Sequence, residues 1–269
     1  MTKTILITGS TDGIGKLAAI KLAKDGHEIY LHGRNADKLA SVISEVKNTS
    51  NNEKIKGFVA DFSDLETVRK LGQQIKNDLP KIDVLINNAG VFKSPTTLTK
   101  GGLDMRMTVN YLASVLLTNE LLPLLEKGNA PRLINLSSAA QAPVSEAVLL
   151  GKKQGSEQGT YAQSKLALTM WSFDLAKKHP NIGVIAVNPG SLLNTNMVRE
   201  AYGRHWSSAD KGANILYNLA VSEKYEGLTG KYFDNDKCSF GNAHSDAYNE
   251  TKIEGLIQTT ENLLAKATE

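Results

Sequence analysis

The sequence predicts an α/β fold in which a single doubly wound, parallel sheet of about seven strands carries helices on both faces. Short apolar segments alternate with longer segments of helical periodicity, about six times along the 269 residues. The apolar segments are rich in Ile, Leu and Val and lack polar alternation, which indicates strands buried on both faces. The connections are short and no linker rich in Pro, Gly and Ser interrupts them, so residues 1–269 are expected to form one domain.

The first half of the chain is expected to supply four strands, each followed by a helix. Ile14, Leu17, Ala18 and Leu22 recur with helical spacing directly after the first apolar segment, which predicts the first helix. The same alternation then repeats along the chain. Strands are expected at residues 4–8, 29–32, 55–60 and 82–86, and helices at residues 14–24, 36–47, 65–79 and 102–125.

The second half continues the alternation and ends in a helical extension of about residues 241–269. Strands are expected at residues 132–137, 183–188 and 231–233, and helices at residues 161–178, 209–220 and 246–266. The last helix carries an apolar stripe that packs either on its own domain or on a partner. That stripe comprises Ile253, Leu256, Ile257, Leu263 and Leu264.

Composition excludes several classes of protein. Hydrophobic residues make up 41% of the chain, and the net charge of +3 is small and scattered, so no nucleic-acid surface is expected. The single cysteine, Cys238, cannot form an intramolecular disulfide and is expected to be semi-buried, and no Cys/His spacing predicts a metal site. The first apolar run is too short for a signal peptide, and polar residues interrupt the most apolar stretch, 112–125. A cytoplasmic protein without a membrane partner is therefore expected.

A glycine-rich loop lies between the first expected strand and helix. Gly9, Gly13 and Gly15 follow a Gly-x-x-x-Gly-x-Gly spacing, which permits a tight turn and lets backbone amides approach a phosphate. The next helix offers its positive end to a pyrophosphate. A purely structural turn is the alternative, but the strand before and the helix after favour dinucleotide binding. The predicted cofactor contacts in this loop are Gly9, Ser10, Thr11, Asp12, Gly13, Ile14 and Gly15.

Arg34 at the end of the second strand favours NADP(H) over NAD(H). An NAD site usually places an acidic residue there to bind the ribose hydroxyls, whereas this chain has Arg34. A guanidinium pairs with a 2′-phosphate through forked, charge-assisted hydrogen bonds. The alternative is that Arg34 is a solvated turn residue.

Tyr161 and Lys165 place a phenol and an ammonium on one face of the same expected helix. A nearby positive charge lowers the pKa of a tyrosine, which then exchanges a proton with a carbonyl or alcohol oxygen. This pair alone is a weak signal, because the spacing is common by chance.

Six segments in order together resemble the classical short-chain dehydrogenase/reductase family, from about residue 3 to residue 235. They are residues 8–15, Asn87-Asn88-Ala89-Gly90, Asn110, Ser137-Ser138, Tyr161 with Lys165, and Asn188-Pro189-Gly190. The resemblance implies a Rossmann-type fold and a catalytic set of Asn110, Ser138, Tyr161 and Lys165.

The resemblance also implies a role for each member of this set. Tyr161 would be the general acid/base, and Lys165 would lower its pKa and hold the nicotinamide ribose. Ser138, rather than Ser137, would orient the substrate oxygen. Asn110 would anchor a water in the proton relay, with a buried structural asparagine as the alternative.

Further cofactor contacts follow from the same resemblance. Asn88, Ala89 and Gly90 would line the cofactor, while Asn87 would support the strand. Asp61 and Phe62 would flank the adenine, with a helix cap as the alternative for Asp61. The implied nicotinamide contacts are Pro189, Gly190 and Thr195.

The chain departs from the family pattern in two places. The threonine after the Pro-Gly turn comes one position late, with Asn194 in its usual place, so either Asn194 or Thr195 contacts the nicotinamide. Ser138 and Tyr161 are 23 positions apart, farther than in many members of the family. This longer loop resembles the retinol-dehydrogenase-like and protochlorophyllide-reductase-like branches.

The predicted function is NADP(H)-dependent hydride transfer between the nicotinamide and a carbonyl or alcohol of a small, apolar substrate. Residues 139–160 and 191–206 are expected to line the substrate pocket. Residues 191–208 are expected to close over it as a lid. For each apolar residue of these segments, packing in the core is the alternative. Those apolar residues are Val144, Val148, Leu149, Leu150, Leu192, Leu193, Met197 and Trp206. The rival functions are an NADP(H)-sensing regulator without catalysis and an enzyme acting on sugar nucleotides. A homodimer or homotetramer is compatible with the resemblance.

Overall fold

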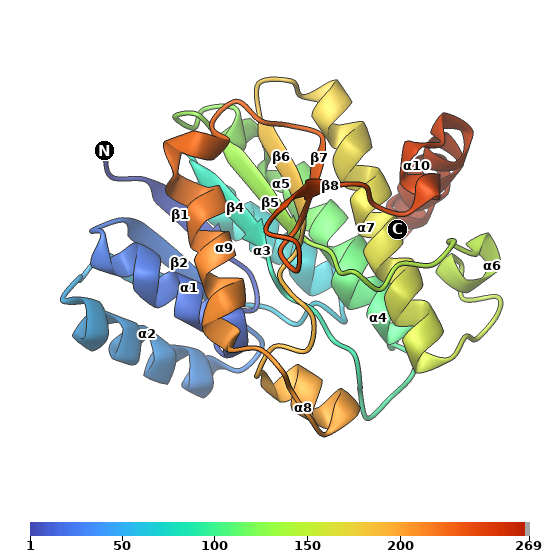
Figure 1. The fold of residues 1–269 in the computed structure, drawn as a ribbon, viewed down its shortest axis with the longest axis horizontal. Coiled ribbons are helices and arrows are strands. Elements are labelled where there is room, and N and C mark those ends of the chain that lie inside the picture. Colours follow the sequence, from blue (N-terminus) through green and yellow to red (C-terminus); the bar gives the residue numbers. More distant parts are fainter. Residues whose placement is uncertain (267–269) are drawn as a thin grey trace.

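The computed structural model describes residues 1–266 and contains one mixed sheet (Figure 1). The strand order is β3-β2-β1-β4-β5-β6-β7-β8, with β8 antiparallel to β7 and every other pair parallel. The strands are β1 (Thr4–Ile7), β2 (Glu28–Gly33), β3 (Ile55–Val59), β4 (Val84–Asn87), β5 (Arg132–Leu136), β6 (Gly183–Asn188), β7 (Lys231–Asp234) and β8 (Ser239–Gly241). The predicted parallel, doubly wound sheet is confirmed, with the short strand β8 in addition.

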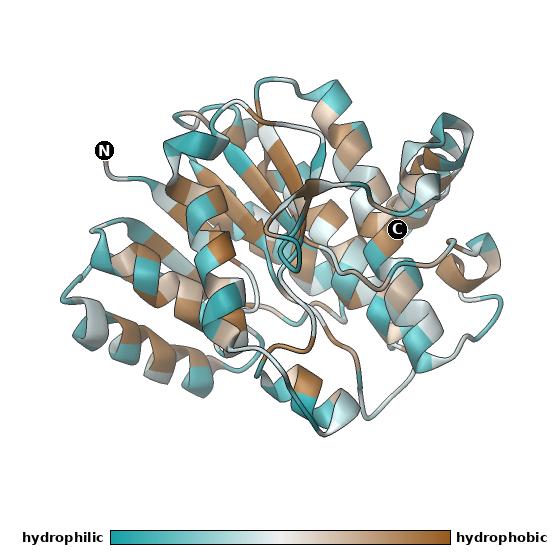
Figure 2. Cartoon of the chain, viewed as in Figure 1, coloured by the Kyte–Doolittle hydropathy of each residue, from teal (hydrophilic) through white to brown (hydrophobic). Residues whose placement is uncertain are grey.

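The central strands are buried along nearly their whole length, as their unbroken apolar sequences predict. All four residues of β4 and all five of β5 are buried, and Figure 2 shows hydrophobic strands at the centre of the molecule. In register, Ile5 and Leu6 of β1 pair with Val84 and Leu85 of β4. Such burial requires a helical layer on each face of the sheet.

Two helical layers cover the sheet, as Figure 1 shows. One layer contains α1 (Gly13–Lys24), α2 (Ala36–Ser50) and α9 (Ala209–Val221), and the other contains α3 (Leu65–Asp78), α5 (Ala113–Leu125) and α7 (Glu157–Lys178). Two separate clusters of buried apolar side chains fill the spaces between the layers and the sheet.

The C-terminal helix α10 (Glu250–Lys266) packs on α7 of the same chain, next to the short helix η3 (Ser245–Tyr248). Ile253, Leu256 and Leu264 are buried there, and the Tyr111 hydroxyl lies 2.8 Å from Thr260 Oγ1. The apolar stripe therefore packs on its own domain. Residues 267–269 of the expected extension lie outside the described residues.

The expected helix at residues 102–125 is divided into three parts. It consists of α4 (Met105–Met107), a π-helical turn η1 (Thr108–Leu112) and α5. A single π turn inside a helix is frequent at functional sites, because it rotates the side chains that follow it. Asn110 lies within this turn.

Several helical segments differ from the sequence prediction. Helix α7 begins at Glu157 rather than Tyr161, because Ser156 caps it by accepting a hydrogen bond from the Gly159 amide. The segments expected to be irregular contain α6 (Glu146–Leu149) and α8 (Asn196–Tyr202), and η2 (Glu223–Tyr225) follows α9.

The prediction that Cys238 is semi-buried is wrong. Cys238 is exposed in the turn between β7 and β8, with a positive φ of 52°. The turn exists because β8 reverses direction against β7, a pairing that the short sequence of β8 did not reveal.

The order of the strands reverses between β1 and β4. The chain moves outward from β1 to β2 and β3, then returns to β4 on the other side of β1. The chain therefore continues from the neighbouring strands β1 and β4 to helices on opposite faces of the sheet, and ligands bind at such a point in open α/β sheets.

Candidate active site

The glycine loop after β1 is held in a single conformation by close contact with the loop after β4. Gly9 has a φ of 60°, and a Cβ atom there would lie 2.7 Å from the Ala89 Cα. A Cβ atom on Gly15 would lie 2.4 Å from the Asn88 Nδ2. Only glycine fits these positions, because a side chain at either one would strike the loop after β4.

Asn88 and Thr8 join the two loops through hydrogen bonds. The Asn88 Nδ2 donates to the carbonyls of Thr8 and Gly9, each at 2.8 Å. The Thr8 hydroxyl oxygen accepts from the amides of Asn88 and Ala89, each at 3.0 Å. The structure thus brings the residues predicted around Gly9 next to those predicted around Ala89.

Ser10 and His32 support the loop from beneath. Ser10 is fully buried, and its hydroxyl donates to Ile7 O and accepts from the His32 amide. The His32 Nδ1 accepts from the Gly9 amide, so its Nε2 carries the hydrogen and donates to Ala60 O. Burial lowers the pKa of His32 to about 4, so the ring stays neutral. The side chain of Ser10 therefore stabilises the conformation of the loop. The sequence did not predict this role for His32, because nothing in its local sequence indicates it.

Asp12 caps helix α1 and connects three elements. It accepts from the Gly13 amide at 2.7 Å, from Asn196 Nδ2 in α8 at 2.6 Å, and from Lys38 Nζ in α2 at 3.4 Å. Partial burial alone would raise the pKa of Asp12, but these hydrogen bonds hold it below its ordinary value. Thr11 and Ile14 flank this cap, both partly exposed.

Arg34 follows β2 directly and is exposed. Gly33 packs against Thr11 of the glycine loop, since a Cβ atom there would lie 2.5 Å from the Thr11 Cγ2. Within residues 1–266 the Arg34 guanidinium takes part in no ion pair, so it is available to an anion beside the glycine loop.

The two residues after β3 occupy different environments. Asp61 is exposed, and its carboxylate accepts from the Ser63 amide at 2.9 Å. The cap of α3 is Asp64, not Asp61, so the helix-cap alternative for Asp61 is wrong. Phe62 is buried, with its ring centroid 4.3 Å from that of His32.

Helix α7 and strand β5 bring Ser138, Tyr161 and Lys165 together. The Ser138 hydroxyl lies near enough to the Tyr161 phenol to lower its pKa, and the Lys165 Nζ lies 5.6 Å from the centroid of the Tyr161 ring. Ser137 instead is buried, with its hydroxyl 2.7 Å from that of Thr169. The predicted choice of Ser138 over Ser137 agrees with this geometry.

The structure does not show the expected lowering of the Tyr161 pKa. Burial raises the pKa of Tyr161 to about 12, and the lowering effect of Ser138 only partly offsets this rise. Burial also lowers the pKa of Lys165 to about 8. The Lys165 ammonium donates to Leu136 O at 2.6 Å rather than to the phenol. Tyr161 is therefore protonated at neutral pH and poised to donate.

Asn110 is fully buried, and its whole amide is engaged. Nδ2 donates to Val91 O and to Ser164 Oγ, each at 3.0 Å, and Oδ1 accepts from the Val91 amide at 2.7 Å. The side chain thus fits the structural alternative, and a water-anchoring role stays a prediction.

The turn at Pro189 and Gly190 is held by a polar cluster after β7 that the sequence did not indicate. Asn235 Nδ2 donates to Pro189 O at 2.8 Å, and Asn188 donates to both Asp234 and Asp236. The short Asp-Asn-Asp run at residues 234–236 was the available signal, because such residues favour tight turns.

Thr195 begins helix α8 and lies next to the glycine loop. Its hydroxyl oxygen caps α8 by accepting from the Val198 amide, and a Cβ atom on Gly13 would lie 3.6 Å from the Thr195 Cγ2. The side-chain Oδ1 of Asn194 instead accepts a hydrogen bond from Arg199 Nη1. This placement favours Thr195 over Asn194 as the nicotinamide contact.

Several residues expected to line the substrate face the core. Val148 and Leu149 are buried, and Val144 and Leu149 line a cavity of about 450 Å³ beneath α10 that Tyr161 does not reach. Leu193 is also buried. The core-packing alternative is correct for Val148, Leu149 and Leu193. Val148 and Leu149 belong to the same cluster of buried apolar side chains as Leu256 of α10.

Two aromatic residues that the sequence did not indicate surround Tyr161. The Phe92 ring centroid lies 4.9 Å from that of Tyr161 and 5.4 Å from that of Tyr202 in α8. These rings give an apolar boundary to the space beside the phenol. The position of Phe92, two residues after the Asn-Ala-Gly turn, was a usable signal.

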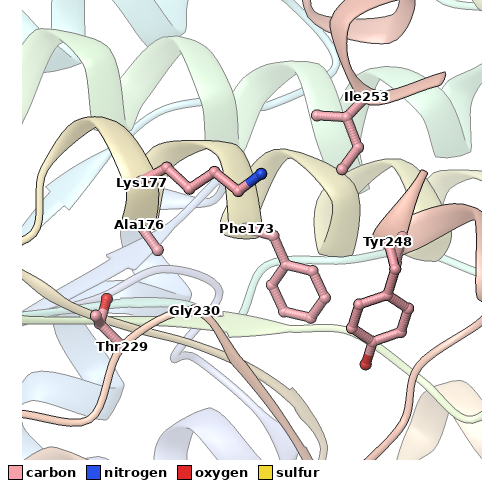
Figure 3. Close-up of a pocket in the computed structure, with 8 residues that line it drawn as sticks. Phe173, Ala176, Lys177, Thr229, Gly230, Tyr248 and Ile253 are labelled. Atoms are coloured by element: carbon pink, nitrogen blue, oxygen red, sulfur yellow. The ribbon is translucent and has the colours of Figure 1, made fainter. Parts of the chain in front are cut away.

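A second cavity lies at the opposite edge of the sheet, between α7 and the C-terminal segment (Figure 3). Its volume is about 320 Å³, and Thr229 and Gly230 line it just before β7 begins. Because Tyr161 lies at the carboxyl edge, this cavity is separate from the catalytic group.

The fold and the glycine loop after β1 together define a dinucleotide-binding α/β protein. Residues 3–205 match the short chain dehydrogenase family, and the chain belongs to that family. The chain is thus an alcohol/carbonyl oxidoreductase that uses a nicotinamide cofactor.

Three relatives illustrate the range of similarity. Mouse (Mus musculus) retinol dehydrogenase 13 is 30% identical over 255 residues, 86% of this chain and 75% of the relative. A Streptomyces sp. (strain C5) protein assigned as daunorubicin C-13 ketoreductase DnrU is 34% identical over 246 residues, 88% and 84% of the two chains. A short chain dehydrogenase from Escherichia coli CFT073, solved with NADPH, is 27% identical with a TM-score of 0.72, covering 87% and 97% of the two chains. The predicted retinol-dehydrogenase-like layout is confirmed.

Two features are absent from the described part of the chain: a helix that could span a membrane and a group of side chains that could bind a metal ion. No helix within residues 1–266 combines the length and apolarity that crossing a bilayer requires. The same residues contain no group of three or more His, Cys, Asp or Glu side chains placed to hold a metal ion.

Proposed function

We propose that the protein transfers hydride between NADP(H) and the carbonyl or alcohol carbon of a small, apolar substrate, with Tyr161 as the general acid/base. The juxtaposition of Ser138, Tyr161 and Lys165 carries the proposal. When bound, the cofactor supplies or accepts the hydride. The glycine contacts with the loop after β4 support this fit, since side chains there would fill the cradle.

In reduction, the protein side chains handle the substrate oxygen and its proton. Ser138 donates a hydrogen bond to the carbonyl oxygen, and the Tyr161 phenol transfers its proton to that oxygen as the C–O double bond becomes single. Lys165 stabilises the phenolate that remains. Because the phenol is protonated at neutral pH, reduction is the proposed direction.

The preference for NADP(H) rests on Arg34, and Lys38 adds a second cation nearby. Arg34 is exposed beside Gly33, which packs on the glycine loop. The neighbour solved with NADPH agrees with this preference. The apolar character of the substrate rests on the Phe92 and Tyr202 rings beside Tyr161. A cytoplasmic location and a homo-oligomer stay predictions.

A fluorescence titration with NADPH and NADH tests the cofactor site. Arg34→Ala is expected to weaken NADPH binding by about 10-fold or more, the effect of losing charge-assisted hydrogen bonds, and to leave NADH binding unchanged. Lys54→Ala, an exposed cation at the amino edge of the sheet, is the matched control. Equal affinity of the wild type for both cofactors would assign Arg34 to the solvated turn.

Turnover with carbonyl compounds tests the catalytic site. Reduction of all-trans-retinal or 4-nitrobenzaldehyde by NADPH is expected, and Tyr161→Phe is expected to lower kcat by about 10³-fold while keeping NADPH affinity. Cofactor binding without turnover across a broad panel of carbonyls would favour the NADP(H)-sensing regulator instead.

A further inference from the structure

Arg106 in α4 is a charged side chain that the reaction described above does not use. It is 0% exposed. Burying a guanidinium is costly unless its N–H groups are paired. Its Nη2 donates to Asp104 Oδ2 at 2.9 Å, its Nε to Thr160 Oγ1 at 2.7 Å, and its Nη1 to Phe92 O at 3.4 Å. Glu157 lies 3.6 Å from Nη1.

Arg106 and Asn110 form two parallel links to helix α7. Arg106 bonds Thr160, and Asn110 bonds Ser164 at 3.0 Å. Residues four apart lie on one face of a helix, so each link is one turn from the other on both helices. Tyr161 lies between Thr160 and Ser164, and the two links therefore bracket it.

The same two residues also hold the loop after β4. Asn110 bonds both the amide and the carbonyl of Val91, and Arg106 bonds the carbonyl of Phe92. The Phe92 ring lies 4.9 Å from the Tyr161 ring. Arg106 thus contacts the residue before Tyr161 and the residue whose ring packs on Tyr161.

We propose that Arg106 is a positioning residue that fixes the Tyr161 phenol and the Phe92 ring relative to each other. This inference rests on the proposed function. A direct role towards substrate or cofactor does not fit a side chain with no exposed surface. A role in stability alone does not explain the choice of partners, since buried ion pairs often contribute little net stability.

The proposal requires the forked shape of the guanidinium as well as its charge. A lysine ammonium balances the Asp104 carboxylate but cannot serve three partners in one plane. Arg106→Lys therefore separates charge balance from geometry. Because a misplacement of about 1 Å can cost about 100-fold in rate, both Arg106→Lys and Arg106→Gln are expected to lower kcat by about 10- to 100-fold.

Arg132 provides the matched control. It is also buried, and its Nη1 donates to Leu219 O and Ser222 O at 2.9 Å each, at the start of β5 and far from the carboxyl edge. Arg132→Gln is expected to lower Tm as Arg106→Gln does, but to leave kcat within about 2-fold. NADPH affinity should stay within about 2-fold in all three variants, since none of them alters the cofactor cradle.

The experiment compares kcat, KM, NADPH affinity and Tm of these variants, well below each Tm, with the carbonyl probes named above. A wild-type kcat in Arg106→Lys would overturn the proposal, because charge balance alone would then suffice. If Arg106→Gln does not fold, Thr160→Val removes the acceptor of Nε with little change in volume, and it is expected to show the same loss of kcat.

A second measurement does not need turnover. In protein with ¹³C-labelled tyrosine rings, Tyr161 is assigned by Tyr161→Phe, and its signal is expected to shift in Arg106→Lys as the Phe92 ring current changes. It should not shift in Arg132→Gln. An unchanged Tyr161 signal would overturn the inference, whereas a wild type that reduces no carbonyl would contradict the proposed function instead.

Discussion

The proposed cofactor cradle, residues 8–15 and 88–90, and the proposed lid segment, residues 191–208, contact each other directly but are built differently. In the cradle, backbone approaches backbone so closely that glycine is required at Gly9 and Gly15. In the lid segment, α8 contains no buried residue, and Tyr202 and Trp206 are 47% and 71% exposed. A rigid cradle beside a loosely attached segment suits an enzyme that fixes one ligand and admits another.

The lid segment is attached to the rest of the molecule at a few defined points. Leu193 is buried, Asn196 bonds Asp12, and the Tyr202 ring contacts Phe92. These contacts connect the lid both to the cofactor loop and to the ring that packs on Tyr161. If the segment opens, as the lid hypothesis requires, these contacts and the hydrogen bonds between Ser191 and Asp236 must break.

The largest expected effect comes from alanine at equivalent glycines in the two regions. Gly9 and Gly203 have similar φ values, 60° and 66°, but only Gly9 has a neighbour that a Cβ atom would strike. Gly203→Ala should cost about 1–2 kcal/mol for left-handed strain alone. Gly9→Ala adds overpacking of about 1–3 kcal/mol and should weaken NADPH binding by about 100-fold or more. Thermal unfolding and cofactor titration measure both, and equal losses of affinity would contradict the comparison.

This difference also explains how much could be predicted from the sequence. The spacing of Gly9, Gly13 and Gly15, together with the strand before and the helix after, is enough to predict the cradle, although the contacts with Ala89 and Asn88 that require Gly9 and Gly15 are visible only in the structure. Tyr161 and Lys165 are paired by helical periodicity alone. Both inferences use neighbours in sequence, where the pattern of residue types is most informative.

Features decided by distant packing escaped prediction. Val148 and Leu149 were expected to line the substrate because they are apolar, yet they are buried in the same cluster as Leu256 of α10, about a hundred residues later in the chain. The direction of the Tyr161 pKa was also missed, since burial depends on the folded surroundings, and its raising effect outweighs the lowering effect of Ser138. Strand β8 is too short for its sequence to show any periodicity.

The Lys165 ammonium in α7 is buried, and this burial lowers the free energy of unfolding. The lid segment has no buried charged side chain. The pKa of Lys165 falls from 10.5 to about 8 on folding because of burial. Since the folded pKa is the lower one, this cost is fully present below about pH 8 and is relieved as pH rises towards 10.5.

The variant Lys165→Met tests whether the stability of the protein rises with pH as this pKa shift requires. The free energy of unfolding of the wild type, measured relative to Lys165→Met, should increase between about pH 7 and pH 10 by about 1–3 kcal/mol. Urea unfolding at the two pH values measures the change. A difference that stays constant or falls with pH would show that burial does not lower the lysine pKa.

The smallest expected effect concerns the tether between the lid and the cradle. Asn196 Nδ2 donates to the Asp12 carboxylate at 2.6 Å, and both groups are largely accessible to water. Such a bond contributes about 0.5–1.5 kcal/mol, so Asn196→Ala should speed NADPH release by about 2- to 10-fold. Tm should not change, because α8 buries nothing that the core needs.

Stopped-flow displacement of NADPH measures the release rate, with Asn262→Ala on α10 as the matched control. Faster release together with an unchanged association rate would show that the tether acts after binding, as a latch on the closed segment. A release rate equal to that of the wild type would mean that the cradle alone retains the cofactor. The lid segment would then serve the substrate side only, and the contact between Tyr202 and Phe92 would be its functional attachment.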